Sequence, residues 1–420
     1  MGKGFDNDFA ASSLNGGRRW RAFLAFLRDT PWLTRSRILG YSMALIAGTV
    51  AVMTWALSGH GIADPMGRPV GTDFLRLWTA SYALLNGQAR TIYEPDMFFA
   101  LERAVTQPAT PDFYPWNYPP SSLLIVYPLA LLPYLQSLAA WLALGLIGYL
   151  AALWRIFPTP LTLWVGLAFP AVFWSVTHGQ TGFLITSLFC WGLLLLPRRP
   201  LLAGILFGVL TFKPHLALLL PVALVAGRQW RTVVAAGVTA ILLAAVSVVF
   251  LGTGVWADFL ASTAATRSML ESGMNVGHYY KMQSIFAAAR LLGFPMIVAY
   301  SLQALTALAA ATAIVCVWRR PTGDPDMKNA ALMAATPLST AFIFDYDLML
   351  LAPPIAWVAR KGLLGRALPY ERTTLVAAFF APFVSRVIGM HTHLLVAPVF
   401  IVSLVVVIIG RLHVTAKRDQ

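Results

Sequence analysis

Charged residues are scarce in this sequence. Only 11% of its 420 residues are Asp, Glu, Lys or Arg, and 58% are hydrophobic, whereas soluble domains average about 25% charged residues. A soluble fold of this length has no way to bury so much apolar surface. Apolar stretches that approach the roughly 20 residues needed to cross a bilayer recur from Ile38 to Ile409. The composition therefore excludes an ordinary soluble protein and predicts an integral membrane protein.

Other patterns are missing as well. The period-two alternation of barrel strands is absent, which leaves helices as the spanning elements, because only helices and closed barrels satisfy their backbone polar groups in lipid. Both cysteines, Cys190 and Cys316, lie in apolar runs, with no zinc or redox spacing. There is no glycine-rich nucleotide loop, and the one Asp-x-Asp lies between apolar segments. These absences disfavour a nucleotide-bound substrate.

The excess of positive charge is distributed in short clusters. The formal net charge is +14, but the basic residues stand between apolar runs, which is typical of the positive-inside pattern and not of a nucleic-acid groove. The basic segment 1–37 is predicted to be cytoplasmic, and so is the tail 412–420. A cleaved signal peptide is not expected, because the first long apolar run begins too late.

Hydropathy predicts an all-α bundle of about twelve membrane spans in one domain, residues 38–411, with both ends of the chain on the inner side. The expected spans are 38–58, 121–133, 137–154, 160–176, 181–197, 200–226, 232–252, 294–318, 329–344, 347–359, 373–389 and 394–411. Arg198 and Arg199 conflict with this count, because it places them outside. They would lie inside only if 121–154 crossed once and 200–226 doubled back, so the topology between 121 and 200 stays open.

The long loop 59–120 is expected to pack on the outer membrane face. Apolar and aromatic residues recur at helical spacing from Phe74 to Leu85, and Asn86-Gly87 follows as a stop signal, which predicts a short interfacial helix. Several later apolar segments are short and interrupted by proline. Irregular helices at membrane depth are tolerated beside a cavity lined by protein, so a cavity is expected.

The few acidic residues are the first candidates for chemistry, because a carboxylate beside an apolar helix is costly. Asp73 stands at the start of the predicted interfacial helix, where it would either cap that helix or act as a base. Asp345 and Asp347 flank Tyr346 between two apolar segments. They form either a solvated turn or part of a site.

Cations and polar residues form the second group of candidates. Lys213 interrupts an apolar stretch and would either pair with an acid or bind a phosphate. The outer loop after residue 252 holds Arg267, His278 and Lys281, a set suited to a lipid phosphate or to interface anchoring. Arg76, Tyr118, Gln180 and Arg386 complete the predicted substrate-binding set. His391-x-His393 offers two metal ligands without a third nearby.

The order of short motifs resembles glycosyltransferase family 87, of the membrane-embedded C superfamily. The matching motifs cover roughly residues 70 to 360 and are Thr72-Asp73-Phe74, Tyr82 to Gly87, Ile92-Tyr93, Tyr118-Pro119-Pro120, Leu131-Leu132-Pro133, Gly179-Gln180, Ala203-Gly204 with Gly208, Lys213-Pro214 and Arg228 to Arg231. One departure concerns the acceptor: Thr336-Pro337 and then Asp345-Tyr346-Asp347 stand where many relatives carry Ser-Pro followed by Trp and His.

The resemblance implies a mannosyltransferase that takes its sugar from a polyprenyl-phosphate lipid and passes it to a lipid or glycan hydroxyl. It also implies that Asp73 is the catalytic base, at the periplasmic side of the inner membrane. Lys213, His278, Lys281 and Arg267 are the candidates for the donor phosphate. No metal, other cofactor or nucleic acid is expected. The alternatives are a transporter or flippase for glycolipid precursors, and a non-catalytic scaffold whose acids merely pair with Lys213 and Arg386.

Overall fold

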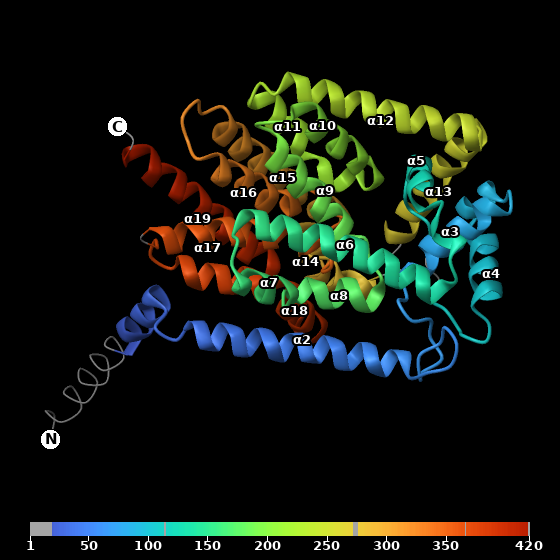
Figure 1. The fold of residues 1–420 in the computed structure, drawn as a ribbon, viewed down its shortest axis with the longest axis horizontal. Helices are drawn as coiled ribbons and strands as arrows, with labels where there is room; N and C mark the ends of the chain where they lie inside the picture. The colour runs from blue at the N-terminus through green and yellow to red at the C-terminus, as the bar shows by residue number, and fades with distance from the viewer. Residues whose placement is uncertain (1–18, 113–114, 272–275, 366, 419–420) are drawn as a thin grey trace, which may run out of the picture.

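The computed structural model describes residues 19–112, 115–271, 276–365 and 367–418. Helices are the only regular elements in these ranges, and no strand forms there. The long helices α2 (Arg35–Leu57), α6 (Tyr134–Ile156) and α12 (Trp230–Leu251) run roughly along one direction, and the first and last described helical segments lie on the same side of the molecule (Figure 1). The prediction of an all-α fold is therefore confirmed.

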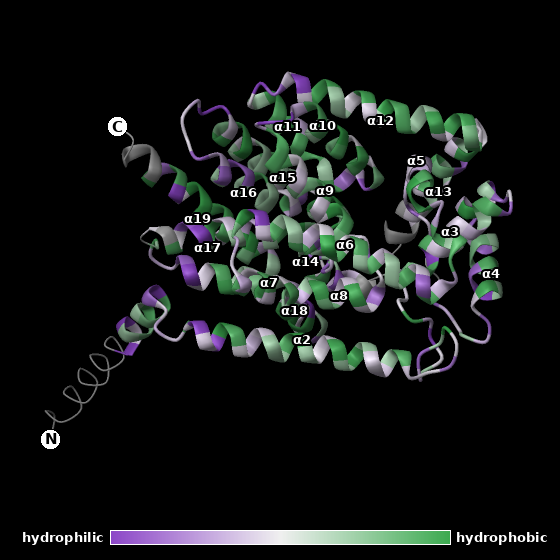
Figure 2. Cartoon of the chain, viewed as in Figure 1, coloured by the Kyte–Doolittle hydropathy of each residue, from purple (hydrophilic) through white to green (hydrophobic). Residues whose placement is uncertain are grey.

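Six helices are long and apolar enough to cross a membrane. They are α2 (Arg35–Leu57), α6 (Tyr134–Ile156), α12 (Trp230–Leu251), α15 (Met296–Trp318), α18 (Glu371–Thr392) and α19 (Ala397–Arg418). A seventh span results if α7 (Pro160–Leu167) and α8 (Pro170–His178), which meet at an angle of 55°, count as one. Apolar residues cover the outward surfaces of α2 and α12 (Figure 2). The chain is thus a multi-pass membrane protein.

The expected count of twelve spans is not confirmed, because several apolar segments form helices too short to cross a bilayer. These are α9 (Gly182–Leu195), α10 (Pro200–Val209), α11 (Leu219–Ala226), α16 (Pro325–Ala335) and α17 (Ala352–Leu364). The 3-10 turns η3 (Leu210–Phe212), η4 (Pro214–Ala217), η6 (Thr336–Ser339) and η7 (Asp347–Leu351) interrupt them. Such breaks survive at membrane depth because surrounding helices can satisfy the freed backbone groups.

The path of the chain explains the conflicting arginines. The segment 120–131 packs beside α3 (Phe74–Leu85), where the Trp78 indole donates to the Leu132 carbonyl at 3.1 Å. Residues 200–226 double back at Lys213, so the chain returns to the end of the bundle from which it started. There the Thr232 hydroxyl donates a hydrogen bond to the Pro200 carbonyl at 3.0 Å. Arg198 and Arg199 therefore lie at the same end of the bundle as Arg360, with which they line one cavity.

The first loop forms a helical layer at the opposite end. It contains α3, η1 (Ala89–Tyr93), α4 (Pro95–Thr106) and α5 (Pro120–Val126), followed by η2 (Leu129–Leu131). The bounds of α3 agree with the predicted helix, although its position at a membrane interface stays a prediction. Further along the chain, α13 (Thr253–Glu271), η5 (Val276–Lys281) and α14 (Ile285–Leu291) complete the described helices between α12 and α15. Arg90 of η1 ties this layer to Asp258 of α13 at 2.7 Å.

Candidate functional site

The candidate polar residues meet where helices end or break. Asp73 and Arg76 open α3, Gln180 lies in the turn between α8 and α9, and Lys213 stands between η3 and η4. Asp345 and Tyr346 lie between η6 and η7, and Asp347 is the first residue of η7; we call residues Asp345 to Asp347 the aspartate loop. Lys281 ends η5, and Arg386 lies within α18. At a helix end, backbone N–H or C=O groups have no hydrogen-bond partner within the helix and are free to bind other groups. The site is therefore assembled from segments that are distant in sequence.

Asp73 does not cap the helix that it precedes. Its backbone is in the right-handed helical region, at φ −77° and ψ −16°, and its side chain makes no capping hydrogen bond. One carboxylate oxygen instead lies 3.4 Å from a guanidinium nitrogen of Arg76, and the Asp73 side chain is 18% exposed. The helix-cap alternative is therefore not what the structure contains, and the carboxylate retains acceptor capacity.

Arg76 extends this pair toward two tyrosines. Its guanidinium lies 5.6 Å from the centre of the Tyr118 ring. Burial opposes the charge, but the neighbouring Tyr118, Asp73 and Tyr346 outweigh it and raise the pKa of Arg76. Burial, followed by the Asp347 carboxylate, raises the pKa of Tyr346. Arg76 is therefore a fixed cation, and Tyr346 keeps a proton that it can donate.

Lys213 forms a buried ion pair with Asp347. The amine lies 2.7 Å from one carboxylate oxygen of Asp347, whose other oxygen accepts from the Phe344 backbone at 3.2 Å. The same amine lies 4.9 Å from the centre of the Tyr346 ring. Of the two predicted roles of Lys213, pairing with an acid is the one observed, and Asp347 is not part of a solvated turn.

Asp345 is likewise buried and paired. One of its carboxylate oxygens lies 2.6 Å from Arg386, and the other accepts from the Tyr346 backbone at 2.8 Å. Burial raises the pKa of Asp345 to about 6, despite the opposing effect of Arg386. The guanidinium of Arg386 also stacks on Trp174, 3.8 Å from the ring centre. The two aspartates thus hold two cations in fixed positions.

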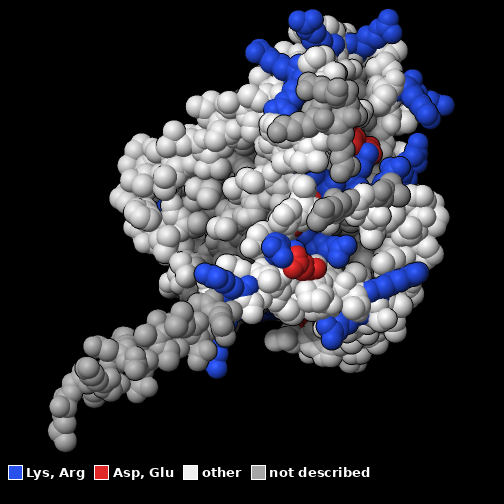
Figure 3. All heavy atoms as spheres, turned by 90° about the vertical axis from the view of Figure 1, so that its left-hand side faces the viewer, with Lys and Arg blue, Asp and Glu red and all other residues white. Residues whose placement is uncertain are grey.

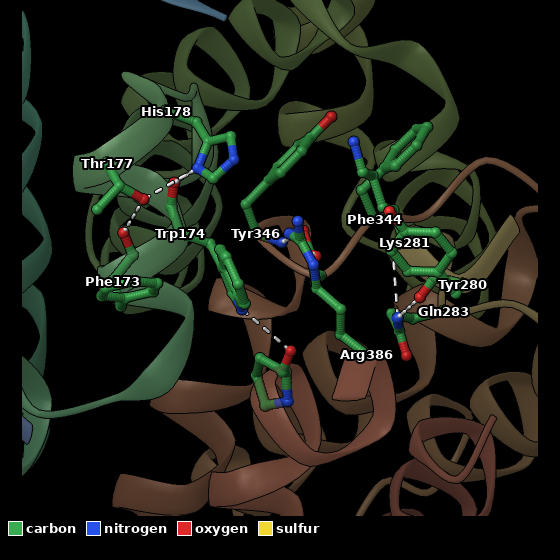
Figure 4. Close-up of polar contacts among 12 residues, drawn as sticks. Phe173, Trp174, Thr177, His178, Tyr280, Lys281, Gln283, Phe344, Tyr346 and Arg386 are labelled. Atoms are coloured by element: carbon green, nitrogen blue, oxygen red, sulfur yellow. Dashed lines mark hydrogen bonds and ion pairs between the residues drawn. The ribbon is translucent and has the colours of Figure 1, made fainter. Parts of the chain in front are cut away.

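His178 joins these pairs into one cluster. Asp73, Arg386 and Lys281 all lie near enough to act electrostatically on its imidazole. Figure 4 shows the Tyr346 ring between His178 and the Lys281 amine, with Arg386 beside its base. The Lys281 carbonyl accepts from the Asp345 backbone at 3.1 Å, which fixes η5 against the aspartate loop. Among the described residues, Lys281 makes no ion pair with a carboxylate.

Gln180 brings an unused donor to the same region. Gln180 is 2% exposed, and its side-chain nitrogen makes no hydrogen bond to the described residues. The Nε atom of Arg76 is also buried without a hydrogen bond. A buried polar group without a partner is costly. Both groups are therefore suited to donate to a polar ligand.

Gly179 holds this turn against the start of α3. Its φ of +64° is left-handed, and an added Cβ would lie 2.4 Å from Cβ of Phe74, the neighbour of Asp73. We expect Gly179→Ala to lower the free energy of unfolding by about 1–3 kcal/mol and to reduce turnover by displacing Asp73.

Thermal unfolding and product formation in detergent would measure both effects of Gly179→Ala. Gly237→Ala, in the middle of α12 with nothing within 4 Å of the added atom, is the control: it should leave turnover unchanged and should not lower stability, since alanine is favoured over glycine inside a helix by about 0.5–1 kcal/mol. Wild-type stability of Gly179→Ala would contradict the close contact.

Some predicted residues are not placed in the site. The side chains of Arg267 and His278 lie outside the described part of the structure. His391 and His393 are exposed, and no group of three His, Cys, Asp or Glu among the described residues could hold a metal ion. Conversely, sequence reasoning missed Trp174 and Phe344, since an aromatic residue in an apolar run gives no signal of its own.

Comparison with known proteins yields one family. The model of glycosyltransferase family 87 matches residues 116–344, which is more than half of the chain and includes Lys213 and Lys281; the match begins after Asp73 and ends one residue before Asp345. Comparison with curated proteins finds no match, and comparison with solved structures finds none either. The matched residues lie within the stretch over which the motifs resemble this family, although the motifs from Thr72 to Tyr93 fall outside the match, and the chain therefore belongs to glycosyltransferase family 87.

Proposed function

We propose that this glycosyltransferase transfers a sugar, with mannose as the first candidate, from a polyprenyl-phosphate lipid to a hydroxyl of a lipid or glycan. The observation that carries the proposal is Asp73: its carboxylate is committed neither to a helix cap nor to a short salt bridge. It borders a partly buried cluster of cations and aromatic rings. A general base opposite fixed cations is what transfer from a phosphate donor requires.

The acceptor hydroxyl is the poor nucleophile in this reaction. As its oxygen bonds to the anomeric carbon, its proton passes to the Asp73 carboxylate, and the bond from that carbon to the phosphate oxygen breaks. The electron pair of that bond leaves with the phosphate. A single displacement inverts the anomeric centre, so a β-linked donor gives an α-linked product.

The departing phosphate gains negative charge, which the cations of the cluster can stabilise. Arg76, Lys213, Lys281 and Arg386 are its cations, and Asp73, Asp345 and Asp347 are its acids. Lys213 and Arg386 are each matched by a buried carboxylate at 2.7 and 2.6 Å, and Arg76 lies 3.4 Å from Asp73. Lys281 makes no ion pair among the described residues, so we propose it as the main phosphate ligand. Fixed charges in a site shielded from water stabilise such a group more than solvated ones do.

Aromatic faces provide a surface for the sugar. The Phe344 and Tyr346 rings stack at a centroid distance of 5.5 Å and an interplanar angle of 6°, and Tyr118 lies beside Arg76. Sugar rings present C–H faces that pack on aromatic surfaces, while their hydroxyls need donors such as the side chain of Gln180. The Asp345 to Asp347 loop therefore contributes to substrate binding in this proposal.

We expect Lys281→Gln to weaken donor use more than it affects stability. Loss of an unpaired cation facing a phosphate should raise KM for the donor or lower kcat/KM by about tenfold or more, since hydrogen bonds to charged groups contribute about 1.5–3 kcal/mol. Steady-state kinetics with varied donor would measure it. Lys281→Arg, which keeps the charge, is the control, and equal kinetics for Lys281→Gln and wild type would remove Lys281 as the phosphate ligand.

The proposed activity can be tested with the purified protein alone. Incubation with a panel of radiolabelled polyprenyl-phosphate sugars and a total membrane lipid extract should give a labelled product from one donor. Product formation without any other protein would exclude a scaffold role. Release of unmodified donor across proteoliposome membranes, with no product, would instead support a transporter, which the family assignment does not favour.

The orientation in the membrane belongs to the same proposal. Figure 3 shows that Lys and Arg far outnumber acids on the face where the described part of the chain begins and ends, which we call the basic face. Positively charged faces are retained on the cytoplasmic side. The Asp73 end would then lie on the outer side of the cytoplasmic membrane, where lipid-linked sugars serve cell-envelope synthesis.

A further inference from the structure

A second cavity lies at the other end of the bundle. Its volume is about 490 Å³, and Ile156, Leu195, Pro325 and Trp357 are among the residues that line it. These residues come from the last turns of α6 and α9, the first residue of α16 and the middle of α17. It therefore opens where four helices meet on the basic face.

This cavity is separate from the candidate active site. The Tyr134 hydroxyl, at the first residue of α6, donates to the Val70 carbonyl at 2.8 Å, three residues before Asp73. Ile156, the last residue of α6, lines the second cavity. The 23 residues of α6 rise by about 35 Å in total. The two sites therefore lie at opposite ends of a membrane-spanning helix.

Four arginines surround the cavity with only one carboxylate. They are Arg155, Arg198, Arg199 and Arg360. Asp326 lies 3.6 Å from Arg360 and is shared with Lys361 at 3.8 Å. Among the described residues, Arg155, Arg198 and Arg199 form no ion pair. The cavity thus carries an excess of positive charge that nothing in the described chain neutralises.

The remaining wall is apolar and aromatic. Leu194, Leu195 and Trp191 form one side, and the Trp191 indole is fixed by its hydrogen bond to the Gly148 carbonyl at 3.0 Å. Trp357 is fully buried, and its indole nitrogen makes no well-formed hydrogen bond, although it lies beside Asp326. Arginines on one side and an apolar wall on the other suit an amphipathic anion.

We propose that this cavity binds the phosphate headgroup of an anionic phospholipid from the cytoplasmic leaflet. Guanidinium groups bind phosphate oxygens in pairs, and basic pockets between helices on the cytoplasmic side are suited to lipid headgroups. The apolar wall lies against the upper part of the acyl chains. A free phosphate ion would satisfy the arginines but would leave the apolar wall without a partner. This proposal rests on the membrane orientation proposed above but does not depend on the proposed reaction.

Native mass spectrometry of the full-length protein in detergent tests the proposal. The probes are phosphatidylglycerol, phosphatidylcholine and inorganic phosphate. We expect phosphatidylglycerol to bind with at least about tenfold preference over phosphatidylcholine, because clustered basic residues attract anionic lipid headgroups. Inorganic phosphate at millimolar concentration should not displace it. Equal binding of the two lipids would overturn the proposal, and so would displacement by phosphate.

Charge-matched variants locate the binding. Arg198→Ala with Arg199→Ala should weaken phosphatidylglycerol binding by about tenfold or more. Arg319→Ala with Arg372→Ala, which removes two exposed arginines of the same face outside the cavity, should change it less than twofold. Equal losses in both double variants would mean diffuse surface attraction and would refute the site. If the double alanine variant lowers the unfolding temperature, Arg198→Gln with Arg199→Gln replaces it, because glutamine keeps a long side chain. Its phosphatidylglycerol binding is then compared with that of Arg319→Ala with Arg372→Ala in the same way.

Discussion

Asp73→Asn is expected to lower turnover by about 10²–10⁴-fold, the usual contribution of a positioned general base. The amide keeps the size of the carboxylate but does not take a proton at neutral pH. Donor binding should survive, because Lys281 and Arg386 lie on other segments. The measurement is product formation under saturating donor, together with a separate titration of donor binding.

Two further variants separate a missing base from a disturbed helix. Asp96→Asn changes an exposed acid in the same loop, at the first turn of α4, and should leave turnover unchanged. Asp73→Glu keeps the carboxylate and should retain more activity than Asp73→Asn. Wild-type turnover by Asp73→Asn would remove Asp73 as the base, whereas equal loss of donor binding and turnover would point to its contact with Arg76.

The identity of the candidate residues could be predicted because polar groups are rare in an apolar chain. A carboxylate or amine inside an apolar stretch is expensive unless it is paired or used, so Asp73, Lys213, Asp345 and Asp347 stood out from the sequence. The helix Phe74–Leu85 was also predictable, since its periodicity and the following Asn86-Gly87 are local signals.

The partners of these residues were not predictable, because they depend on packing. Nothing local indicates that Lys213 meets Asp347, which is 134 residues away, or that Trp174 stacks on Arg386. The predicted count of twelve spans is not confirmed, for a related reason. Hydropathy detects an apolar segment but not whether it crosses alone, and 200–226 breaks at Lys213 while 120–131 packs on α3.

Removing only one partner of the Lys213–Asp347 ion pair should lower the free energy of unfolding strongly. Both side chains are at most 5% exposed, and Lys213→Met would leave a buried carboxylate without its cation, which costs about 3–5 kcal/mol. Thermal or denaturant unfolding in detergent would measure the loss. The control is Arg90→Met, which breaks an ion pair whose arginine is 73% exposed and should cost about 1 kcal/mol or less.

Removing both partners separates structure from chemistry. Lys213→Met combined with Asp347→Leu leaves no unpaired charge, so we expect it to recover most of the stability lost by Lys213→Met. Its turnover should nevertheless stay at least about tenfold below wild type, because a cation next to Tyr118 and Tyr346 is then missing from the phosphate side of the cluster. A double variant with both stability and turnover near wild type would show that the pair only holds the aspartate loop, and would leave Lys281 and Arg386 to stabilise the departing phosphate.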